Sequence, residues 1–140
     1  MATVAARPDR RIVDRITVGD IRSEQAHAYA GDGVTDGVAE GHAFREARGW
    51  MRYALTVFDD TEVTVACTFA PSDAARTFDL VVENQTVATY TFREAERKTV
   101  EFRIPIETTR GHTSILVMLR ATRGATPALV ELRTVQDHNE

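Results

Sequence analysis

The stretch GDIRSEQAHAYAGDG, residues 19–33, gathers a serine, a glutamate, a histidine and two aspartates into a segment with little apolar periodicity. Ser23, Glu24 and His27 are the residue types of a nucleophile, an orienting acid and a general base. Such catalysis needs an ordered hydrogen-bond chain beside an oxyanion hole, and no GxSxG elbow surrounds Ser23. The sequence therefore favours a structural role, in which Ser23 and Glu24 bond loop amides and His27 packs at an edge of the fold.

An enzyme is the alternative hypothesis. A small stand-alone bacterial isomerase, cyclase or hydrolase would use His27 or His42 as general base, oriented by Glu24 or Asp32. Glycoside hydrolysis would need two carboxylates at a fixed separation, and Glu24 with Asp32 or Asp36 is the available pair. With 21 acidic residues in the chain, some carboxylates lie close together by chance. Catalysis is therefore the weaker interpretation.

The same segment also contains groups that bind metals. His27 and His42 match no compact zinc motif. Asp32, Asp36 and the carbonyls of a glycine-containing loop are hard oxygen donors, which suit calcium. A structural calcium ion is the one cofactor that the sequence suggests, although Asp-Gly pairs are also ordinary turn sequences.

Sugar binding needs apolar aromatic walls and a few polar groups that bond hydroxyls. Tyr29 lies within the polar stretch, and strand parity places Trp50 on the face opposite the apolar residues of its own strand. Arg45 and Arg48 are candidates to bind a carboxylate or an acidic sugar, but an ion pair of Arg45 with Glu24 is favoured instead. The predicted ligand-binding residues are Glu24, His27, Tyr29, Arg45 and Trp50.

The elements that must position these residues are strands, because apolar residues alternate with period two from Trp50 onward. The runs 50–58 and 62–69 are expected to pair as neighbours, and 77–92 reads as a hairpin that turns at Asn84-Gln85. The residues predicted to face the core are Met51, Tyr53, Leu55, Val57, Val63, Val65, Cys67, Phe69, Phe78, Leu80, Val82, Val100, Phe102, Ile104, Ile115, Val117, Leu119, Val130 and Leu132.

Strands at this spacing, joined by short turns, predict an all-β fold: an antiparallel β-sandwich of jelly-roll type with about eight strands. Residues 1–140 are expected to form one domain. Only 11–18 offers a strand in the first third, so 19–49 is predicted to be an irregular polar excursion with at most one helical turn near 42–49. Long loops in compact domains are often functional, so the site is sought there.

Composition restricts the partners. The net charge of -4 gives no reason to expect nucleic acid or a membrane surface. No apolar run matches a secretory signal or a membrane span, so a soluble cytoplasmic protein is expected, or an extracellular one if the domain is excised from a secreted enzyme. Cys67 is the only cysteine and is expected to be an inert buried thiol. Lys98 is the only lysine, and this preference for arginine suggests a GC-rich bacterial genome.

Four stretches in order carry a resemblance to a known family. They are DRITVGDIRSEQAH, FREARGWMRYALTV, RTFDLVVENQTVAT and FRIP, and together they extend from about Asp14 to Val135. Their order and spacing resemble the C-terminal β-sandwich module of β-L-arabinofuranosidase-like glycoside hydrolases (family 127), which is similar to galactose-binding-like modules. Two positions depart from the pattern: Asn84-Gln85 stands where members carry an Asp-Gly turn, and Met51 where they carry an aromatic residue.

The resemblance implies an accessory function. In that family the chemistry belongs to a separate helical barrel with carboxylate and cysteine metal ligands, which this chain lacks. It therefore implies a non-catalytic domain that binds a carbohydrate or another small molecule. A third hypothesis is a structural module that self-associates or docks on a catalytic partner through outward-facing Val81, Tyr90 and Phe92.

Overall fold

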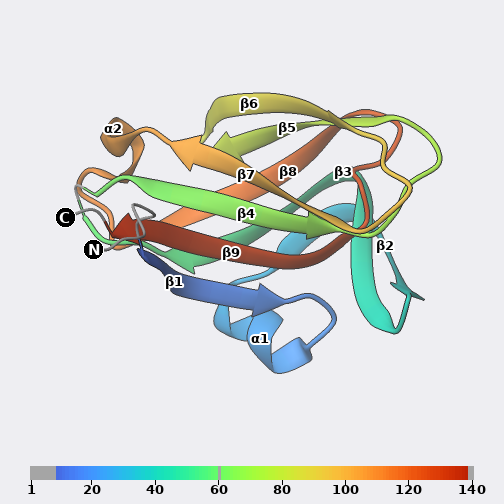
Figure 1. The fold of residues 1–140 in the computed structure, drawn as a ribbon, viewed down its shortest axis with the longest axis horizontal. Coiled ribbons are helices and arrows are strands. Elements are labelled where there is room, and N and C mark those ends of the chain that lie inside the picture. The colour runs from blue at the N-terminus through green and yellow to red at the C-terminus, as the bar shows by residue number, and fades with distance from the viewer. Residues whose placement is uncertain (1–8, 60, 139–140) are drawn as a thin grey trace, which may run out of the picture.

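The computed structural model describes residues 9–59 and 61–138, which form two layers of antiparallel strands with two short helices (Figure 1). Neither helix is long or apolar enough to cross a membrane, within the described residues. The elements are β1 (Asp9–Thr17), α1 (Ile21–Ala26), β2 (Ala30–Ala39), β3 (His42–Thr56), β4 (Val63–Phe69), β5 (Arg76–Val82), β6 (Gln85–Phe92), β7 (Lys98–Ile104), α2 (Ile106–Thr109), β8 (Ser114–Arg123) and β9 (Leu129–His138).

The strand order is β6-β5-β8-β3 in one layer, with β2 beside β3, and β1-β9-β4-β7 in the other. All of these pairings are antiparallel. One bridge between Arg45 of β3 and Leu129 of β9 joins the two layers along an edge. The predicted antiparallel sandwich is confirmed, with nine strands in the described residues rather than about eight.

The core lies between the layers and consists mostly of the predicted inward faces, although Val130 belongs to a separate small cluster and Phe92, predicted to face outward, lies in the core. Tyr53, Phe69, Phe78 and Phe92 are fully buried and belong to one cluster of aromatic and aliphatic side chains. Burying each large apolar side chain contributes about 1.5–3 kcal/mol, so this cluster is a main source of stability. Cys67 is a free thiol in the same core, as predicted, and burial raises its pKa.

The predicted pairing of 50–58 with 62–69 is wrong. Tyr53 of β3 pairs with Val117 of β8, whereas Val65 of β4 pairs with Phe102 of β7. The connection between β3 and β4 crosses from one layer to the other, so neighbours in sequence face each other across the core. Alternation predicts which side chains point inward, but it carries no information on which strand lies alongside.

The β5–β6 hairpin turns one residue earlier than predicted. Glu83 and Asn84 both have positive φ values, 51° and 66°, which is the geometry of a type I′ turn. A bulge between Leu80 and Val81 shifts the register of β6 and turns Phe92 into the core.

The docking patch predicted on this hairpin is therefore wrong. Val81 and Phe92 are only 6% and 0% exposed, and Tyr90 packs against Phe78 and Phe102. These side chains stabilise the hairpin and its contacts, and Val81 and Phe92 offer no apolar surface to a partner.

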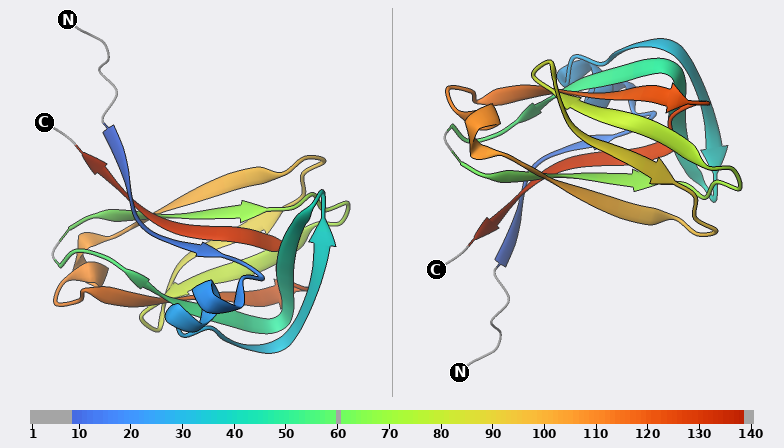
Figure 2. Two further views of the ribbon diagram at one scale, coloured as in Figure 1. Left: turned by 90° about the horizontal axis from the view of Figure 1, so that it is seen from below. Right: turned by 90° about the horizontal axis from the view of Figure 1, so that it is seen from above.

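The predicted irregular excursion 19–49 is also wrong, because it holds α1 and a long hairpin of β2 and β3. Figure 2 shows this hairpin standing across one end of the sandwich, between the two layers. Glycine and aspartate hide the strand pattern of β2, yet the glycines are needed. A Cβ atom at Gly37 would lie 2.6 Å from the ring of Phe44, and Gly33 takes a positive φ of 68° at a bulge.

Candidate functional site: a pocket between α1 and β3

Helix α1 is held in place by local polar contacts at its start. The Asp20 side chain accepts hydrogen bonds from the backbone N–H groups of Arg22 and Ser23 at 3.1 and 3.3 Å. The Ser23 hydroxyl accepts a bond from the Thr17 N–H at 3.1 Å, which ties the helix to β1. Six residues are too few for a helix that is stable by itself, so these contacts fix its position.

His27 fixes the other end of the helix. Its Nδ1 lies 2.6 Å from the Ser23 carbonyl oxygen and its Nε2 lies 2.7 Å from Asp14 Oδ1. Both partners are acceptors, so both ring nitrogens donate and the ring is an imidazolium. Burial lowers the pKa of His27, but the Ser23 carbonyl and the Asp14 carboxylate raise it by more. Asp14 in turn accepts from the Thr56 N–H at 2.7 Å, so His27 links α1 to β1 and β3.

Glu24 is a buried carboxylate that accepts side-chain hydrogen bonds from Arg45 and Tyr53. Arg45 donates to both of its oxygens, from Nε at 2.7 Å and from Nη2 at 2.8 Å, and the Tyr53 hydroxyl donates at 2.9 Å. The Glu24 side chain is 4% exposed and that of Arg45 is 19% exposed. A bidentate pair of this kind fixes the orientation of the guanidinium as well as its charge. The predicted ion pair of Arg45 with Glu24 is confirmed.

Tyr29 completes the cluster from the side of β2. The Arg45 guanidinium carbon lies 4.8 Å from the centre of the Tyr29 ring, a cation–π contact. The Tyr29 and Tyr53 rings lie with their centroids 5.1 Å apart. Burial raises the pKa of Tyr29, so its hydroxyl stays protonated and can donate to a ligand.

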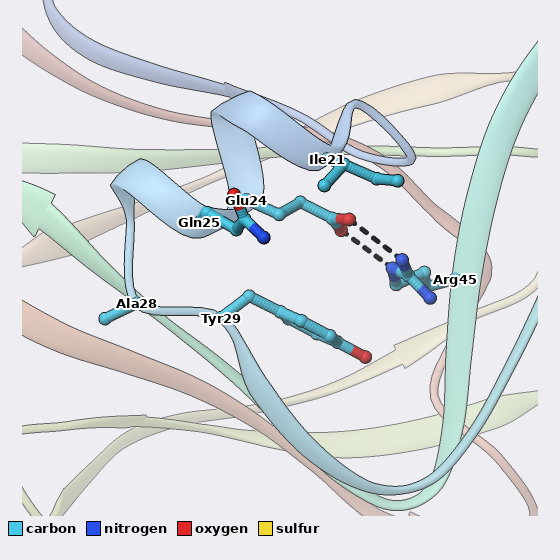
Figure 3. Close-up of a pocket in the computed structure, with 6 residues that line it drawn as sticks. All are labelled: Ile21, Glu24, Gln25, Ala28, Tyr29 and Arg45. Atoms are coloured by element: carbon cyan, nitrogen blue, oxygen red, sulfur yellow. Dashed lines mark hydrogen bonds and ion pairs between the residues drawn. The ribbon is translucent and has the colours of Figure 1, made fainter.

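These side chains surround a pocket of about 380 Å³, which we call the α1–β3 pocket (Figure 3). In the figure α1 forms one wall, Tyr29 lies opposite it, and Arg45 reaches in from β3 towards Glu24. Ile21 at the rim is 66% exposed. Apolar walls with a few fixed polar groups are the usual design of a small-molecule site. The pocket is lined by Ile21, Glu24, Gln25, Ala28, Tyr29 and Arg45.

The pocket is suited to binding rather than to acid catalysis. Burial raises the pKa of Glu24, but hydrogen bonds from Arg45 and Tyr53 lower it by more, so the carboxylate stays ionised and occupied. A glycosidase acid needs a raised pKa and a second carboxylate nearby. Glu24 is the one carboxylate among the residues that line this pocket.

The structure does not bring the predicted catalytic residues together in one hydrogen-bonded group. The predicted partner of His27 was Glu24 or Asp32, whereas the observed partner is Asp14. Ser23 bonds Thr17 and Glu24 bonds Arg45, so no triad is assembled. His42 begins β3, is exposed and does not line the α1–β3 pocket.

The predicted ligand-binding set is divided as well. Glu24, Tyr29 and Arg45 meet in the pocket, whereas His27 and Trp50 do not line it. Trp50 lies on the outer face of β3, as its parity predicted, and the guanidinium of Arg52 lies 5.4 Å from the centre of its ring.

Sequence reasoning missed three residues of the pocket, Ile21, Gln25 and Ala28, because the helix that carries Ile21 and Gln25 was not predicted. Arg48 lies apart from Arg45 and lines a separate pocket with Glu46 and Arg76.

The predicted calcium ligands lie in a strand rather than in a loop. Asp32 pairs with Trp50 and Asp36 pairs with Arg45 along β2. Four residues of strand separate the two aspartates, which is about 13 Å. Among residues 9–59 and 61–138, no group of three or more His, Cys, Asp or Glu side chains is arranged to hold a metal ion. The glycine loop that was expected to add carbonyl ligands does not form.

Two layers of antiparallel strands define the class of the protein, an antiparallel β-sandwich, and a polar pocket lies beside one edge. A family model described as a family of unknown function (DUF6805) matches residues 8–135, and the chain belongs to that family. No curated protein matches the chain.

Several solved structures share the fold. A family 35 carbohydrate-binding module from an environmental isolate is 17% identical with a TM-score of 0.68, over 90% of this chain and 98% of that chain. A family 35 module in complex with a glucuronic-acid-containing disaccharide is 15% identical with a TM-score of 0.56, over 90% and 98% of the two chains. A 4-O-methyl-α-glucuronidase of family GH115, with specificity for decorated arabinogalactans, is 11% identical with a TM-score of 0.63, over 99% of this chain and 19% of that chain.

Proposed function

We propose that the protein is a non-catalytic carbohydrate-binding module and that a sugar binds in the α1–β3 pocket. The observation that carries the proposal is the lining of the pocket: the Tyr29 ring and the Ile21 side chain lie beside the fixed guanidinium of Arg45 and the amide of Gln25. Aromatic and aliphatic groups pack against the C–H faces of a sugar, and the polar groups bond its hydroxyls. The fold shared with carbohydrate-binding modules supports the proposal.

The charge in the pocket indicates a neutral sugar. Glu24 occupies one edge of the Arg45 guanidinium and cancels its charge. The opposite edge of Arg45 keeps N–H donors for ligand oxygens, and Gln25 offers both a donor and an acceptor. Hydroxyl groups match this arrangement better than a carboxylate does, because a carboxylate would face Glu24 across the same guanidinium.

We further infer that the module accompanies a glycoside hydrolase. The resemblance to the accessory module of the family 127 enzymes supports this, as does the glucuronidase in which the matching part is 19% of a longer chain. On this proposal the module brings its enzyme to the glycan, and it is located wherever that enzyme acts. Because Val81 and Phe92 are buried, docking on an enzyme would use a surface other than the predicted patch.

Calorimetry with neutral sugars tests the proposed function. Galactose, arabinose and xylose, with their short oligosaccharides, are titrated into the protein, and at least one should bind with millimolar affinity or better. Ile21→Ala and Gln25→Ala should each weaken binding by about three- to tenfold, the loss expected for one apolar or one neutral hydrogen-bonding contact.

Matched controls lie outside the pocket. Val38 is 73% exposed and Gln85 is also exposed, so Val38→Ala and Gln85→Ala remove a branched aliphatic and an amide side chain from surface positions that do not line the pocket. Both controls should bind as the unaltered protein does. If no neutral sugar binds at millimolar concentration, or if the controls weaken binding as much as the pocket variants do, the proposal is wrong.

A further inference from the structure

A second groove crosses the outer face of the β1-β9-β4-β7 layer, with a volume of about 450 Å³. Its floor is a row of four paired residues, because Thr17 pairs with Glu131, Glu131 with Thr68, and Thr68 with Thr99. Four neighbouring strands enclose three spacings of about 4.8 Å, so the row is about 14 Å long. We call this the outer-face groove, and its lining residues are Thr17, His42, Thr68, Arg97, Thr99, Val130, Glu131 and Arg133.

The floor of the groove carries hydroxyl groups on rigid strands. The hydroxyls of Thr68 and Thr99 lie 2.8 Å apart, so one donates to the other. The second hydroxyl proton and the remaining lone pairs stay available to a ligand. Because both threonines are held in paired strands, little conformational entropy is lost when they bind.

Arg133 lines the groove and has only a long ion pair, shared with Arg15, among the interactions of the described residues. Its side chain is 23% exposed, and its Nε is buried without a hydrogen-bond partner among the described residues. The nearest carboxylate oxygen, on Glu131, is 3.5 Å away, and the other oxygen of Glu131 bonds Arg15 at 3.1 Å. One carboxylate therefore serves two guanidinium groups, and added negative charge beside Arg133 would be favourable.

The groove is also positively charged in a chain whose net charge is -4. Its lining holds two guanidinium groups, on Arg97 and Arg133, and a single carboxylate, on Glu131. Arg97 is exposed in the β6–β7 loop and has no bonded partner within residues 9–59 and 61–138. Arg15 of β1 also forms an ion pair with Glu131. The neighbouring row across the sheet contains Arg15, Arg133 and one acidic residue, Glu101 of β7.

We propose that the outer-face groove binds an anionic oligosaccharide, a sugar chain bearing carboxylates that lies across the four strands. Its carboxylates contact Arg97 and Arg133, and its hydroxyls bond Thr68 and Thr99. The inference rests on the proposed function in taking the ligand to be a carbohydrate. It uses different residues and a charged rather than a neutral ligand, so the two proposals can fail separately.

Amide chemical shifts of ¹⁵N-labelled protein locate the binding. The probes are a tetramer of galacturonic acid, the neutral tetramer of galactose, and galacturonic acid itself. The acidic tetramer should shift the amides of Thr68, Thr99 and Glu131, and the neutral tetramer should not. The monomer should bind more weakly, because it offers a single carboxylate to two arginines. Absence of shifts at these three amides with the acidic tetramer overturns the inference, whatever happens at Gln25 and Tyr29.

Charge variants in one loop test the role of Arg97. Arg97→Gln should weaken binding of the acidic tetramer about tenfold, the effect of losing one hydrogen bond to a charged group. Arg93 is equally exposed in the same β6–β7 loop but does not line the groove, so Arg93→Gln is the matched control and should bind normally. Both changes are on the surface and should leave the Tm unchanged. Equal weakening by the two variants would show general charge attraction and would overturn the inference.

Discussion

Replacing Glu24 by glutamine should destabilise the fold by about 3 kcal/mol. The carboxylate is 4% exposed and accepts three hydrogen bonds, two from Arg45 and one from Tyr53. Removing one partner of a buried ion pair typically costs about 3–5 kcal/mol, because the other charge stays buried without compensation. Arg45 is 19% exposed and so keeps some contact with water, which places the cost at the lower end.

The hydroxyl of Tyr53 provides an internal scale for this prediction. Tyr53→Phe keeps the buried ring and removes one hydrogen bond to a charged group, so it should cost about 1.5 kcal/mol. The double variant of Glu24 and Tyr53 should cost less than the sum of the two single changes, because the Tyr53 hydroxyl has lost its charged partner once Glu24 is neutral. Glu96 is exposed, so Glu96→Gln serves as the control and should change stability by less than about 0.5 kcal/mol.

Urea unfolding followed by circular dichroism measures the free energy of unfolding of all four variants, and thermal unfolding measures their Tm. For a chain of this length, a loss of 3 kcal/mol corresponds to a decrease in Tm of about 10 °C, which is easily resolved. A loss below about 1 kcal/mol in Glu24→Gln, or strict additivity with Tyr53→Phe, would refute the view that this buried cluster holds α1 on β3.

Three further predictions concern other contacts: the His27–Asp14 pair and the approach of Gly37 to Phe44. The His27→Gln variant should be less stable than the unaltered protein, and the difference should be greatest below pH 6.5. Because the folded-state pKa of His27 is raised above 6.5, the difference should shrink as the pH rises through that pKa. Urea unfolding at several pH values measures it. Conversely, the pKa of Asp14 is lowered, so its contribution to the free energy of unfolding is present near neutral pH and is lost as the pH falls through its folded-state pKa. Measuring stability at decreasing pH checks this, and Asp14→Asn should show no such loss. Gly37→Ala should destabilise the fold by about 1–3 kcal/mol, because the added methyl group meets the ring of Phe44. Gly41→Ala should cost less, because its methyl group meets no atom within 4 Å and the only cost is the strain of its positive φ. Thermal unfolding distinguishes the two variants.

Most of the strand faces were predictable from the sequence, and most of the pairings were not. Leu55, Val65 and Leu80 are fully buried as their alternation predicted, because a strand places successive side chains on opposite faces whatever its neighbours are. The glycine-rich β2 was missed because its residues have low strand propensity and only one of its edges pairs, with β3.

The candidate site was predictable only in part. The ion pair of Arg45 with Glu24 follows from opposite charges on residues that both belong to the polar segment. The partnership of His27 with Asp14 joins positions 13 residues apart, and the Tyr53 bond to Glu24 joins positions 29 residues apart. Neither contact is marked by the composition of one segment, because Asp14 and Tyr53 belong to strands that only the tertiary fold brings beside α1.

The sequence by itself determined most of the side chains that face the core, because the two-residue period of a strand is a local property of the backbone and fails where a bulge interrupts it, as before Phe92. The tertiary structure alone decided which strands lie side by side. It also decided that α1 packs against β3 to enclose a pocket, and that four strands align Thr17, Glu131, Thr68 and Thr99 in one row. The physical reason is that pairing and docking are settled by competition among all the apolar and polar surfaces of the chain, and the lowest free energy is a property of the whole arrangement.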